Sequence, residues 1–313
     1  MKEHKGVEQF QSEKETVVTI GTFDGVHTGH QKIIKRLVSA GRESGLESVI
    51  LTFFPHPRMV LQQDTGMKLI NTIEERVDIL STTGIDHLVV HPFTREFSQL
   101  DAQEYVRDIL VEKLRARKII IGYDHRFGRN RSANIEDLRQ LGKIYGVEVE
   151  EISKQEIDEV AVSSTKIRKA LMAGEVEKAN RFLQYPFILS GWVVRGLGLG
   201  RDLGYPTANL LIPESYRLIP KEGVYIVRSE LWDQSVVFGL MSIGVRPTIG
   251  GSQLAIETHF LDFDGDLYGR FISIQMLSRI RDQKDFGNLE ALRKGMDKDK
   301  EIALKYIQKH YAQ

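Results

Sequence analysis

Cysteine is absent from this chain of 313 residues, and its absence removes several classes of chemistry at once. Without a thiol there is no disulfide, no thiolate metal site and no cysteine nucleophile. The sequence also lacks any apolar run near the roughly 20 residues that a membrane-spanning helix needs. Its first 15 residues are polar. We therefore expect no signal peptide, no membrane partner and a cytoplasmic location.

Net charge is the second feature that the chain lacks. Lys and Arg number 43 and Asp and Glu also number 43, so the formal charge at pH 7 is zero. A balanced chain creates no broad positive field toward nucleic acid or a membrane surface. We therefore expect small-molecule partners, no nucleic-acid partner, and phosphate binding that is confined to local sites. The composition leaves the oligomeric state open.

What the chain does contain, from about residue 15 to 152, is an alternation of short apolar runs and helix-like segments. The apolar runs lie at 17–21, 48–54, 87–91, 118–122 and 147–152. Between them, apolar residues recur at helical spacing near 30–44, 72–83, 101–116 and 134–145. This alternation predicts a parallel sheet with helices on both faces. Ligands of such sheets bind at the carboxyl ends of the strands, so the loops that follow them should meet there.

The pattern changes beyond residue 163. Residues 163–183 have the spacing of two short helices, and short strands separated by turn residues then follow from 187 to 280. Several short strands at regular spacing suggest a small β-barrel. Residues 288–311 return to a helical pattern. The length suits two domains, and we place their boundary near Tyr185 and Pro186.

Two histidines stand three residues apart in the stretch VVTIGTFDGVHTGHQKIIKRL, residues 17–37. The stretch has the pattern of a strand, a glycine-rich turn and a helix, which aims backbone N–H groups and a positive helix end at the turn. His27 and His30 would add hydrogen-bond donors for phosphate oxygens at such an anion site. Two alternatives stay open. A zinc site would need a further ligand, and the pair can also be two ordinary polar histidines at a helix start.

A second segment, VSSTKIRKAL at 162–171, favours the phosphate interpretation. Ser163, Ser164 and Thr165 are residue types that cap helices. Lys166 and Arg168 follow in the first turn, where cations oppose the helix dipole unless an anion lies nearby. The alternative is a capped surface helix with solvated charges.

These two elements resemble motifs of a known superfamily. The element His27-Thr28-Gly29-His30 matches the H-x-G-H motif of the nucleotidyltransferase superfamily, and SSTKIR is similar to its second phosphate element. The longer motifs GTFDGVHTGHQ, TFFPHPR and GYDHRFG resemble the adenylyltransferase half of prokaryotic bifunctional riboflavin kinase/FAD synthetases. The resemblance implies a Rossmann-like FMN adenylyltransferase domain over residues 1–185. It implies catalytic roles for His27, His30 and Arg168, and substrate contacts at Gly21, Phe23, Asp24, Pro55, Pro57, Asp124, Ser163, Ser164 and Thr165.

The stretch GLGLGRDLGYPTANL, residues 196–210, invites a dinucleotide-binding interpretation because of its glycines. That fingerprint requires a helix to open after the glycines, and Pro206 does not continue one. A flexible flap that approaches a phosphate closely is the better interpretation. Thr207 and Asn209 offer a hydroxyl and an amide oxygen, which are hard ligands suited to Mg²⁺ with ATP. A plain glycine-rich hairpin is the alternative.

The same stretch is similar to the G-x-x-x-G-R-x-x-G-[FY]-P-T-A-N run of the family's riboflavin kinase half, and SIGVRPT at 242–248 recurs there too. The resemblance implies a Greek-key β-barrel kinase domain with a C-terminal helix over 186–313. It implies that Thr207 and Asn209 hold metal and nucleotide, and that Glu257 is the general base, although a lone strand glutamate is usually only solvated. Further nucleotide contacts are implied for Gly198, Gly200, Arg201, Gly204, Pro206 and Arg246.

Three positions depart from the family pattern. Ser242 stands where Asn is usual, His125 where Phe is common, and Ala133 where Gly is common. None of the three carries a chemical role, so the resemblance predicts that both halves are active and make FMN and then FAD from riboflavin and ATP. Two rival functions stay open. One is a nucleotidyltransferase with another acceptor, such as pantetheine phosphate or nicotinamide mononucleotide, and the other is a non-catalytic flavin-binding protein.

Overall fold

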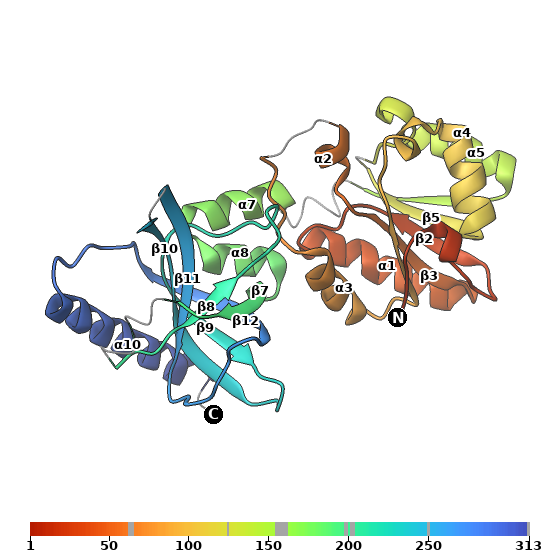
Figure 1. The fold of residues 1–313 in the computed structure, drawn as a ribbon. Coiled ribbons are helices and arrows are strands. Elements are labelled where there is room, and N and C mark those ends of the chain that lie inside the picture. The colour runs from red at the N-terminus through yellow and green to blue at the C-terminus, as the bar shows by residue number, and fades with distance from the viewer. Residues whose placement is uncertain are drawn as a thin grey trace. The chain divides into compact units, whose positions relative to one another are not determined.

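The computed structural model describes residues 1–61, 66–123, 125–153, 162–196, 200, 204–248 and 251–311, with the backbone alone for 246–248 and 251–253. The chain forms two compact units, Met1–Ser164 and Thr165–Gln313, which we call the N-terminal and C-terminal units (Figure 1). Each unit has its own sheet and its own hydrophobic core.

A six-stranded sheet forms the centre of the N-terminal unit, and every neighbouring pair of its strands is parallel. The strands are β1 (Lys2–His4), β2 (Thr16–Ile20), β3 (Glu47–Phe53), β4 (His87–His91), β5 (Ala116–Gly122) and β6 (Glu148–Ile152). Their order is β1-β4-β3-β2-β5-β6, so that β1 and β6 form the edges. This arrangement confirms the predicted parallel α/β fold. Only β1 was not expected, because its three residues are too few to show a pattern.

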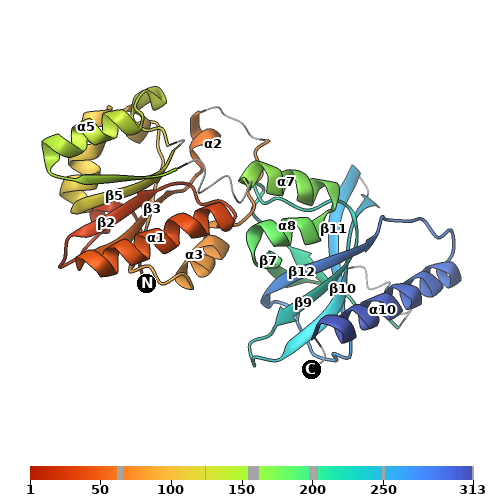
Figure 2. The same cartoon turned by 180° about the vertical axis from the view of Figure 1, so that it is seen from behind.

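Helices cover both faces of this sheet, as Figures 1 and 2 show. On one face lie α1 (Thr28–Ser44) and α3 (Ile73–Ser81). On the other face lie α5 (Ile135–Tyr145) and the short α4 (Ala102–Glu104), which continues into the π-helical segment η3 (Tyr105–Lys113). The remaining short elements are η1 (Val7–Gln9), α2 (Pro57–Leu61), η2 (Phe97–Gln99) and η4 (Arg129–Arg131).

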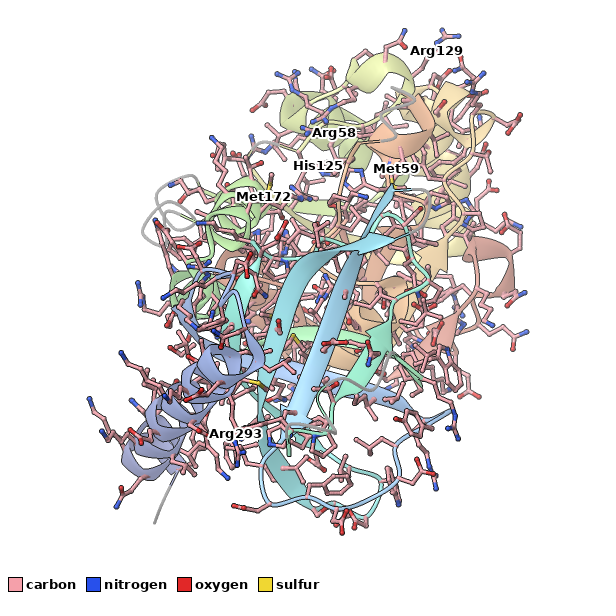
Figure 3. All side chains as sticks on the ribbon, turned by 60° about the vertical axis from the view of Figure 1, so that its left-hand side comes forward. Arg58, Met59, His125, Arg129, Met172 and Arg293 are labelled. Atoms are coloured by element: carbon pink, nitrogen blue, oxygen red, sulfur yellow. The ribbon has the colours of Figure 1, made fainter. Side chains whose placement is uncertain are left out.

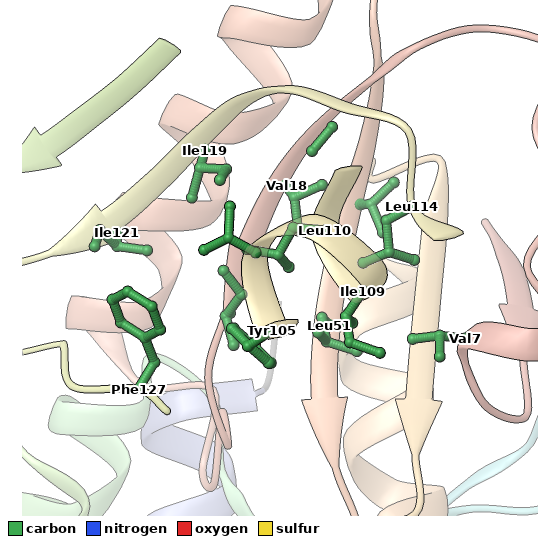
Figure 4. Close-up of a cluster of buried hydrophobic side chains, with 14 of the residues drawn as sticks. Val7, Val18, Leu51, Tyr105, Ile109, Leu110, Leu114, Ile119, Ile121 and Phe127 are labelled. Carbon is green, nitrogen blue, oxygen red and sulfur yellow. The ribbon is translucent and has the colours of Figure 1, made fainter. Parts of the chain in front are cut away.

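Alternate residues of the central strands enter two separate hydrophobic clusters. On one face, Val18, Leu51 and Ile119 join Tyr105 and Leu110 of η3 in the cluster of Figure 4. The cluster beneath α1 and α3 takes the neighbouring strand residues Val17, Ile50 and Ile120. Because both faces are buried, the strands are continuous apolar runs in the sequence, which is why they could be predicted.

The strand order changes direction at β2. The chain passes from β2 to β3 and β4 on one side, and then to β5 and β6 on the other side. In open parallel sheets, ligands bind outside the carboxyl ends of the strands beside such a change of direction. The loops that follow β2, β3 and β5 carry the predicted motifs, and the parallel pairing places all three at the same edge of the sheet.

The C-terminal unit combines short helices, a closed barrel and a long helix (Figure 2). The helices are α7 (Ser164–Ala173), α8 (Val176–Leu183) and α10 (Leu289–Tyr311). The barrel has the order β10-β11-β8-β7-β12-β9, and its paired strands are antiparallel. Its strands are β7 (Phe187–Val194), β8 (Ala208–Leu211), β9 (Gly223–Glu230), β10 (Val236–Thr248), β11 (Gly251–Phe260) and β12 (Phe271–Arg281). A β-barrel with a C-terminal helix confirms the second predicted fold.

The two compact units divide between Ser164 and Thr165, about 20 residues before the domain boundary that the sequence suggested near Tyr185 and Pro186. Packing explains the difference, because α8 contacts β7 and β12. Its Asn180 side chain donates to the Met276 carbonyl and accepts from the Phe187 N–H, both at 2.8 Å. The helices α7 and α8 therefore fold with the barrel. The assignment of one activity to residues 1–185 and the other to 186–313 stays a prediction.

Candidate active sites

A tight loop after β2 carries the first predicted site, residues 21–30. Its backbone is left-handed at Phe23 (φ +48°), Gly25 (φ +85°) and Val26 (φ +35°). For a residue with a Cβ such a conformation is uncommon and costs energy, so packing must hold it. Phe23 and Val26 are both buried, and a Cβ on Gly21 would lie 3.1 Å from the Phe23 ring. The loop is therefore a packed, well-defined entry to α1.

The two histidines lie together at the start of α1. His27 is the N-cap residue of this helix, and its side chain makes no capping hydrogen bond. His30 stacks on it, with ring centroids 3.7 Å apart and planes 20° from parallel. Phe23 packs against His30 at a centroid distance of 5.0 Å. The imidazoles thus occupy the positive end of a helix, which is where anions bind.

Burial lowers the pKa of His30 well below its usual value, and the nearby His27 and Arg76 lower it further. The ring is therefore neutral at physiological pH, with one nitrogen as donor and the other as acceptor. Its Nδ1 is buried and has no hydrogen-bond partner among the residues that the structure describes. A water molecule, an ion or a ligand would satisfy such an atom, so its position agrees with the predicted phosphate site.

Asp24, a predicted substrate contact, has its carboxylate engaged within the protein. Oδ1 accepts from the backbone N–H groups of Ile70 (2.9 Å) and Asn71 (3.3 Å). The same oxygen lies 3.8 Å from Nη2 of Arg76, and both side chains are only 1% exposed. The Asp24 carbonyl accepts from Oγ of Ser164 (2.9 Å). Asp24 thus joins three segments at the site, and a direct contact with a ligand stays a prediction.

Asn71 and Arg76 are residues near this site that the sequence did not reveal. Both are fully buried, and Arg76 lies in the first turn of α3. A capping box begins this helix: the Thr72 hydroxyl accepts from the Glu75 N–H (3.1 Å), and the Glu75 carboxylate accepts from the Thr72 N–H (3.0 Å). The T-x-x-E pattern marks the helix start. Nothing local signals that the next residue is a buried cation.

The loop after β3 contains the predicted residues Pro55 and Pro57. The Phe54–Pro55 peptide bond is cis. Pro57 is the first residue of α2, where a missing N–H removes no helical hydrogen bond. His56 between them is buried, and its Nδ1 accepts from the Arg58 N–H (3.1 Å). Figure 3 labels Arg58 of α2, which follows this loop, and His125 of the loop after β5.

Two departures from the family pattern lie in the loop after β5. The His125 and Phe127 rings stack with centroids 6.0 Å apart. Burial, with the charge of Arg131, lowers the pKa of His125 to about 4. Ala133 is buried and exchanges two backbone hydrogen bonds with Phe127, at 3.1 and 3.2 Å. A methyl group therefore fits where the family commonly has glycine.

The second phosphate element forms the start of α7. Ser163 and Thr165 are exposed, and Ser164 between them is tied to the loop after β2 through Asp24. Arg168 lies in the same helix and is half-buried. Thr165 and Arg168 belong to the C-terminal unit. Their approach to the two histidines therefore stays a prediction.

In the barrel, Glu257 lies in the middle of a row of three polar residues on adjacent strands. It pairs directly with Asn209 of β8 on one side and with Ser242 of β10 on the other. Directly opposed residues point to the same face, with Cβ atoms about 5 Å apart. The structure therefore brings one predicted metal ligand and the predicted base together, and it adds Ser242 to them.

The flap glycines lie close against the residues that follow them. A Cβ on Gly196 would meet the Asn209 amide at 2.3–2.7 Å, and one on Gly200 would lie 2.3 Å from the Tyr205 carbonyl oxygen. Only glycine permits such approaches. Gly204 has a φ of +82°, a conformation that also favours glycine. Beyond it the chain enters the strand β8 and no helix, which agrees with the rejection of a dinucleotide fingerprint.

Two contacts hold the segment that leads into β8. The Tyr205 hydroxyl donates to Asp297 of α10, and His259 Nδ1 donates to the Pro206 carbonyl (2.9 Å). Burial and the bond to Asp297 raise the pKa of Tyr205 to about 12, and burial lowers the pKa of His259. His259 follows Glu257 by two residues and lies on the same face of β11. The strand that carries the predicted base therefore also contacts the segment just before β8, the strand that carries the predicted metal ligand Asn209.

A cavity of about 340 Å³ opens beside Glu257. Of the two predicted metal ligands, Asn209 is placed beside this cavity by its pairing with Glu257. Its amide oxygen and the Thr207 hydroxyl are ligand types that suit Mg²⁺. A Cβ on Gly196 would collide with the Asn209 amide, so the backbone there approaches this side chain closely. The described residues contain no group of three His, Cys, Asp or Glu that would hold a metal alone. A hydroxyl and an amide oxygen would suit Mg²⁺ that ATP phosphates also bind, and the binding of this ion stays a prediction.

The structure does not test four of the predicted contact residues. Three of them, Asp124, Gly198 and Arg201, lie outside the described residues, and Arg246 is described by its backbone alone.

Comparison with known proteins gives two matches along the chain. Residues 9–166 match the family described as FAD synthetase, and residues 183–307 match the family described as riboflavin kinase. A bifunctional riboflavin kinase/FMN adenylyltransferase from Buchnera aphidicola subsp. Schizaphis graminum is 35% identical over 93% of this chain and 94% of its own. The one from Pseudomonas fluorescens is 37% identical over 90% of both chains. The chain belongs to this family.

Membership of the bifunctional riboflavin kinase/FMN adenylyltransferase family confirms the resemblance that the motifs indicated. A solved structure, described as a macrolide-efflux protein from Streptococcus pneumoniae, is also similar. It is 30% identical, the alignment covers 96% of this chain and 97% of that one, and the TM-score is 0.85. Within the described parts of the present chain, no helix has the length and apolar character to cross a bilayer.

Proposed function

We propose that this chain makes two flavin cofactors in succession. It phosphorylates riboflavin to FMN with ATP, and it then transfers AMP from a second ATP to FMN, which gives FAD and pyrophosphate. The observation that carries the proposal is the presence of both family matches in one chain, each over a compact fold with a candidate site. The relatives that match over nearly the whole length are named for the same two activities.

In the kinase step, the riboflavin 5′-hydroxyl attacks the γ-phosphorus of ATP. Glu257 orients this hydroxyl and accepts its proton while the new P–O bond forms and the bond to ADP breaks. Its place between Asn209 and Ser242 supports this role, because nucleotide and acceptor then lie on opposite sides of the carboxylate. Thr207 and Asn209 would hold Mg²⁺ with ATP, and the ion would supply positive charge that neutralises the phosphates.

In the adenylyl step, the FMN phosphate attacks the α-phosphorus of ATP and pyrophosphate leaves. The attacking phosphate is already ionised, so the step needs no strong base. His27, His30 and the N-terminus of α1 stabilise the charge that develops on the phosphate oxygens. The neutral state of His30 supports a role as a hydrogen-bond donor. Ser164, Thr165 and Arg168 add a second set of phosphate contacts.

In this proposal residues 1–185 carry the FMN adenylyltransferase and residues 186–313 carry the riboflavin kinase. The substrates ATP, riboflavin and FMN are small molecules, and the cytoplasm is the expected location. Both steps depend on Mg²⁺ bound with ATP.

A single incubation tests the function. The protein is mixed with riboflavin, ATP and Mg²⁺, and the flavins are separated by chromatography at intervals. We expect FMN to appear first and FAD to follow. If FMN forms without FAD, a panel that includes pantetheine phosphate and nicotinamide mononucleotide identifies another acceptor. Flavin binding without ATP turnover would instead support a non-catalytic protein.

A further inference from the structure

Gln283 lines the cavity that holds Glu257, and it lies between β12 and α10. Its side chain is exposed, so a ligand can reach it. Nε2 makes two hydrogen bonds, one to Oγ of Ser242 (2.8 Å) and one to the carbonyl of Ile243 (2.9 Å). A side-chain amide has two N–H donors and one carbonyl acceptor. Both donors of Gln283 are therefore used within the protein.

These two contacts determine which way the amide points. The Ile243 carbonyl can only accept, so the amide nitrogen and not the oxygen must face it. Oε1 is consequently directed away from Ile243, and no described residue donates a hydrogen bond to it. A fixed acceptor in a cavity is suited to a hydroxyl group of a ligand.

Small residues leave room for such a ligand. Gly244 and Ala255 are directly opposed and line the same cavity, two residues along the strands from Ser242 and Glu257. A Cβ on Gly244 would lie 3.0 Å from Nε2 of Gln283. The amide therefore packs on the glycine and stands at the side of the open space. Ser242, which departs from the family pattern, supplies the short side chain that accepts this amide.

Gln283 also lines a second cavity, of about 590 Å³, and Glu222 is the other residue that the two cavities share. The second cavity includes Met172 and Leu254, whose side chains are 66% and 43% exposed. Its other residues are Ile219 and Pro220, which are apolar, and the charged Lys221 and Asp282. Gln283 thus stands where two cavities meet, and the second of them offers apolar side chains that a ring could contact. Consider a ligand that consists of a polyol chain attached to a flat apolar ring. If the end of its chain lies at Glu257 and its ring in the second cavity, the junction of chain and ring lies at Gln283.

We propose that Gln283 determines the specificity of the kinase for a polyol-bearing acceptor. Its Oε1 accepts a hydrogen bond from an inner hydroxyl of the side chain, while Glu257 acts on the terminal hydroxyl. Ser242 is a positioning residue, because it holds the amide in the orientation that exposes Oε1. The proposal rests on the kinase function proposed above, and it names the part of the substrate that the site distinguishes.

The test compares two acceptors in the full-length protein. One is riboflavin, and the other is a flavin with a 5-hydroxypentyl side chain, which keeps the terminal hydroxyl and lacks the inner ones. Gln283→Met keeps the length of the side chain and removes the acceptor. We expect the variant to raise the KM for riboflavin about three- to tenfold, with kcat nearly unchanged, and to leave the KM for the hydroxypentyl flavin unchanged. Ser242→Ala should give a smaller change of the same pattern.

Gln308→Met, on the exposed surface of α10, is the matched control and should change neither KM. An equal rise in KM for both acceptors in Gln283→Met would overturn the proposal, because the residue would then shape the cavity without distinguishing a hydroxyl. An unchanged KM for riboflavin in both variants would also overturn it. If the unaltered protein phosphorylates neither flavin, the kinase function itself is wrong and this proposal falls with it.

Discussion

The imidazole rings of His27 and His30 stack with their centroids 3.7 Å apart at the first turn of α1. His30 is neutral because burial and two neighbouring groups lower its pKa. A neutral ring at a helix start binds an anion by hydrogen bonding and leaves most of the electrostatic attraction to the helix end. This geometry agrees with the predicted phosphate site, whereas a zinc site would need further ligands beside the pair.

His30→Ala should block FAD formation while FMN still accumulates. A lost hydrogen bond to a charged phosphate costs about 1.5–3 kcal/mol, which is roughly a 10- to 150-fold decrease in rate. The measurement is the rate of FAD formation at saturating FMN and ATP. His310→Ala, at an exposed position of α10, is the control and should keep the normal rate. An unchanged FAD rate in His30→Ala would remove this residue from the site.

Glu257→Gln should lower FMN formation by about 10²–10⁴, the usual contribution of a positioned base. Gln has nearly the same volume, so the loss should appear in turnover while riboflavin binding stays close to normal. FMN supplied from outside should still be converted to FAD. Glu230→Gln, at the exposed end of β9, serves as the control. Normal FMN formation in Glu257→Gln would mean that the base lies elsewhere.

Asp24→Asn should destabilise the N-terminal unit by about 3 kcal/mol, because it leaves the buried charge of Arg76 without the nearby carboxylate. The change would be measured as the free energy of unfolding in urea. Asp108→Asn provides a contrast, since Asp108 pairs with Arg107 at the surface and its replacement should have a much smaller effect. Equal effects of the two replacements would argue against the importance of the buried pair.

His125 should make the protein less stable in mild acid. Its pKa is about 4 in the folded state and about 6.5 in an unfolded chain. Between these values the unfolded state binds the proton and the folded state does not, so stability falls as the pH falls from 6.5 toward 4. His125→Phe, which restores the common family residue, should reduce the difference in unfolding free energy between pH 7 and pH 5. An undiminished difference would show that other groups cause the acid sensitivity.

Much of the fold could be predicted because its signals are local. The buried strands of the parallel sheet are continuous apolar runs, and those of the barrel lie between turn residues, so both could be located from the sequence alone. The strand β8 was not predicted, because Pro206 and the glycines before it suggest only a flap. Its pairing with β11 depends on Glu257, far along the chain. Only the structure could show that contact.

The candidate sites show the same limit. The predicted site around His27 was suggested by residue type and spacing, whereas Glu257 was indicated by the family resemblance alone. The burial of Arg76 could not be predicted, since it depends on Asp24, which lies in a different loop. The proposed role of Gln283 could not be predicted from the sequence either. The orientation of its amide depends on Ser242 and Ile243, which lie on a strand distant in sequence. Contacts between polar side chains that are far apart in the sequence cannot be predicted from the local pattern of residues.

The charged side chains of the edge strand β6 affect whether copies of the protein can pair through their open sheets. A barrel closes on itself, but an open sheet presents the backbone of its edge strands to any other extended chain. Three of the five residues of β6 are Glu148, Glu150 and Glu151, and Lys118 of the inner neighbour strand holds the first two at 2.7 and 2.8 Å. Arg36 and Arg139 pair with Glu150 and Glu151 at 2.6 and 2.7 Å. A second chain that paired with β6 would therefore have to pack beside a row of charged groups that already have partners in their own molecule. Charged side chains on an edge strand disfavour edge-to-edge aggregation.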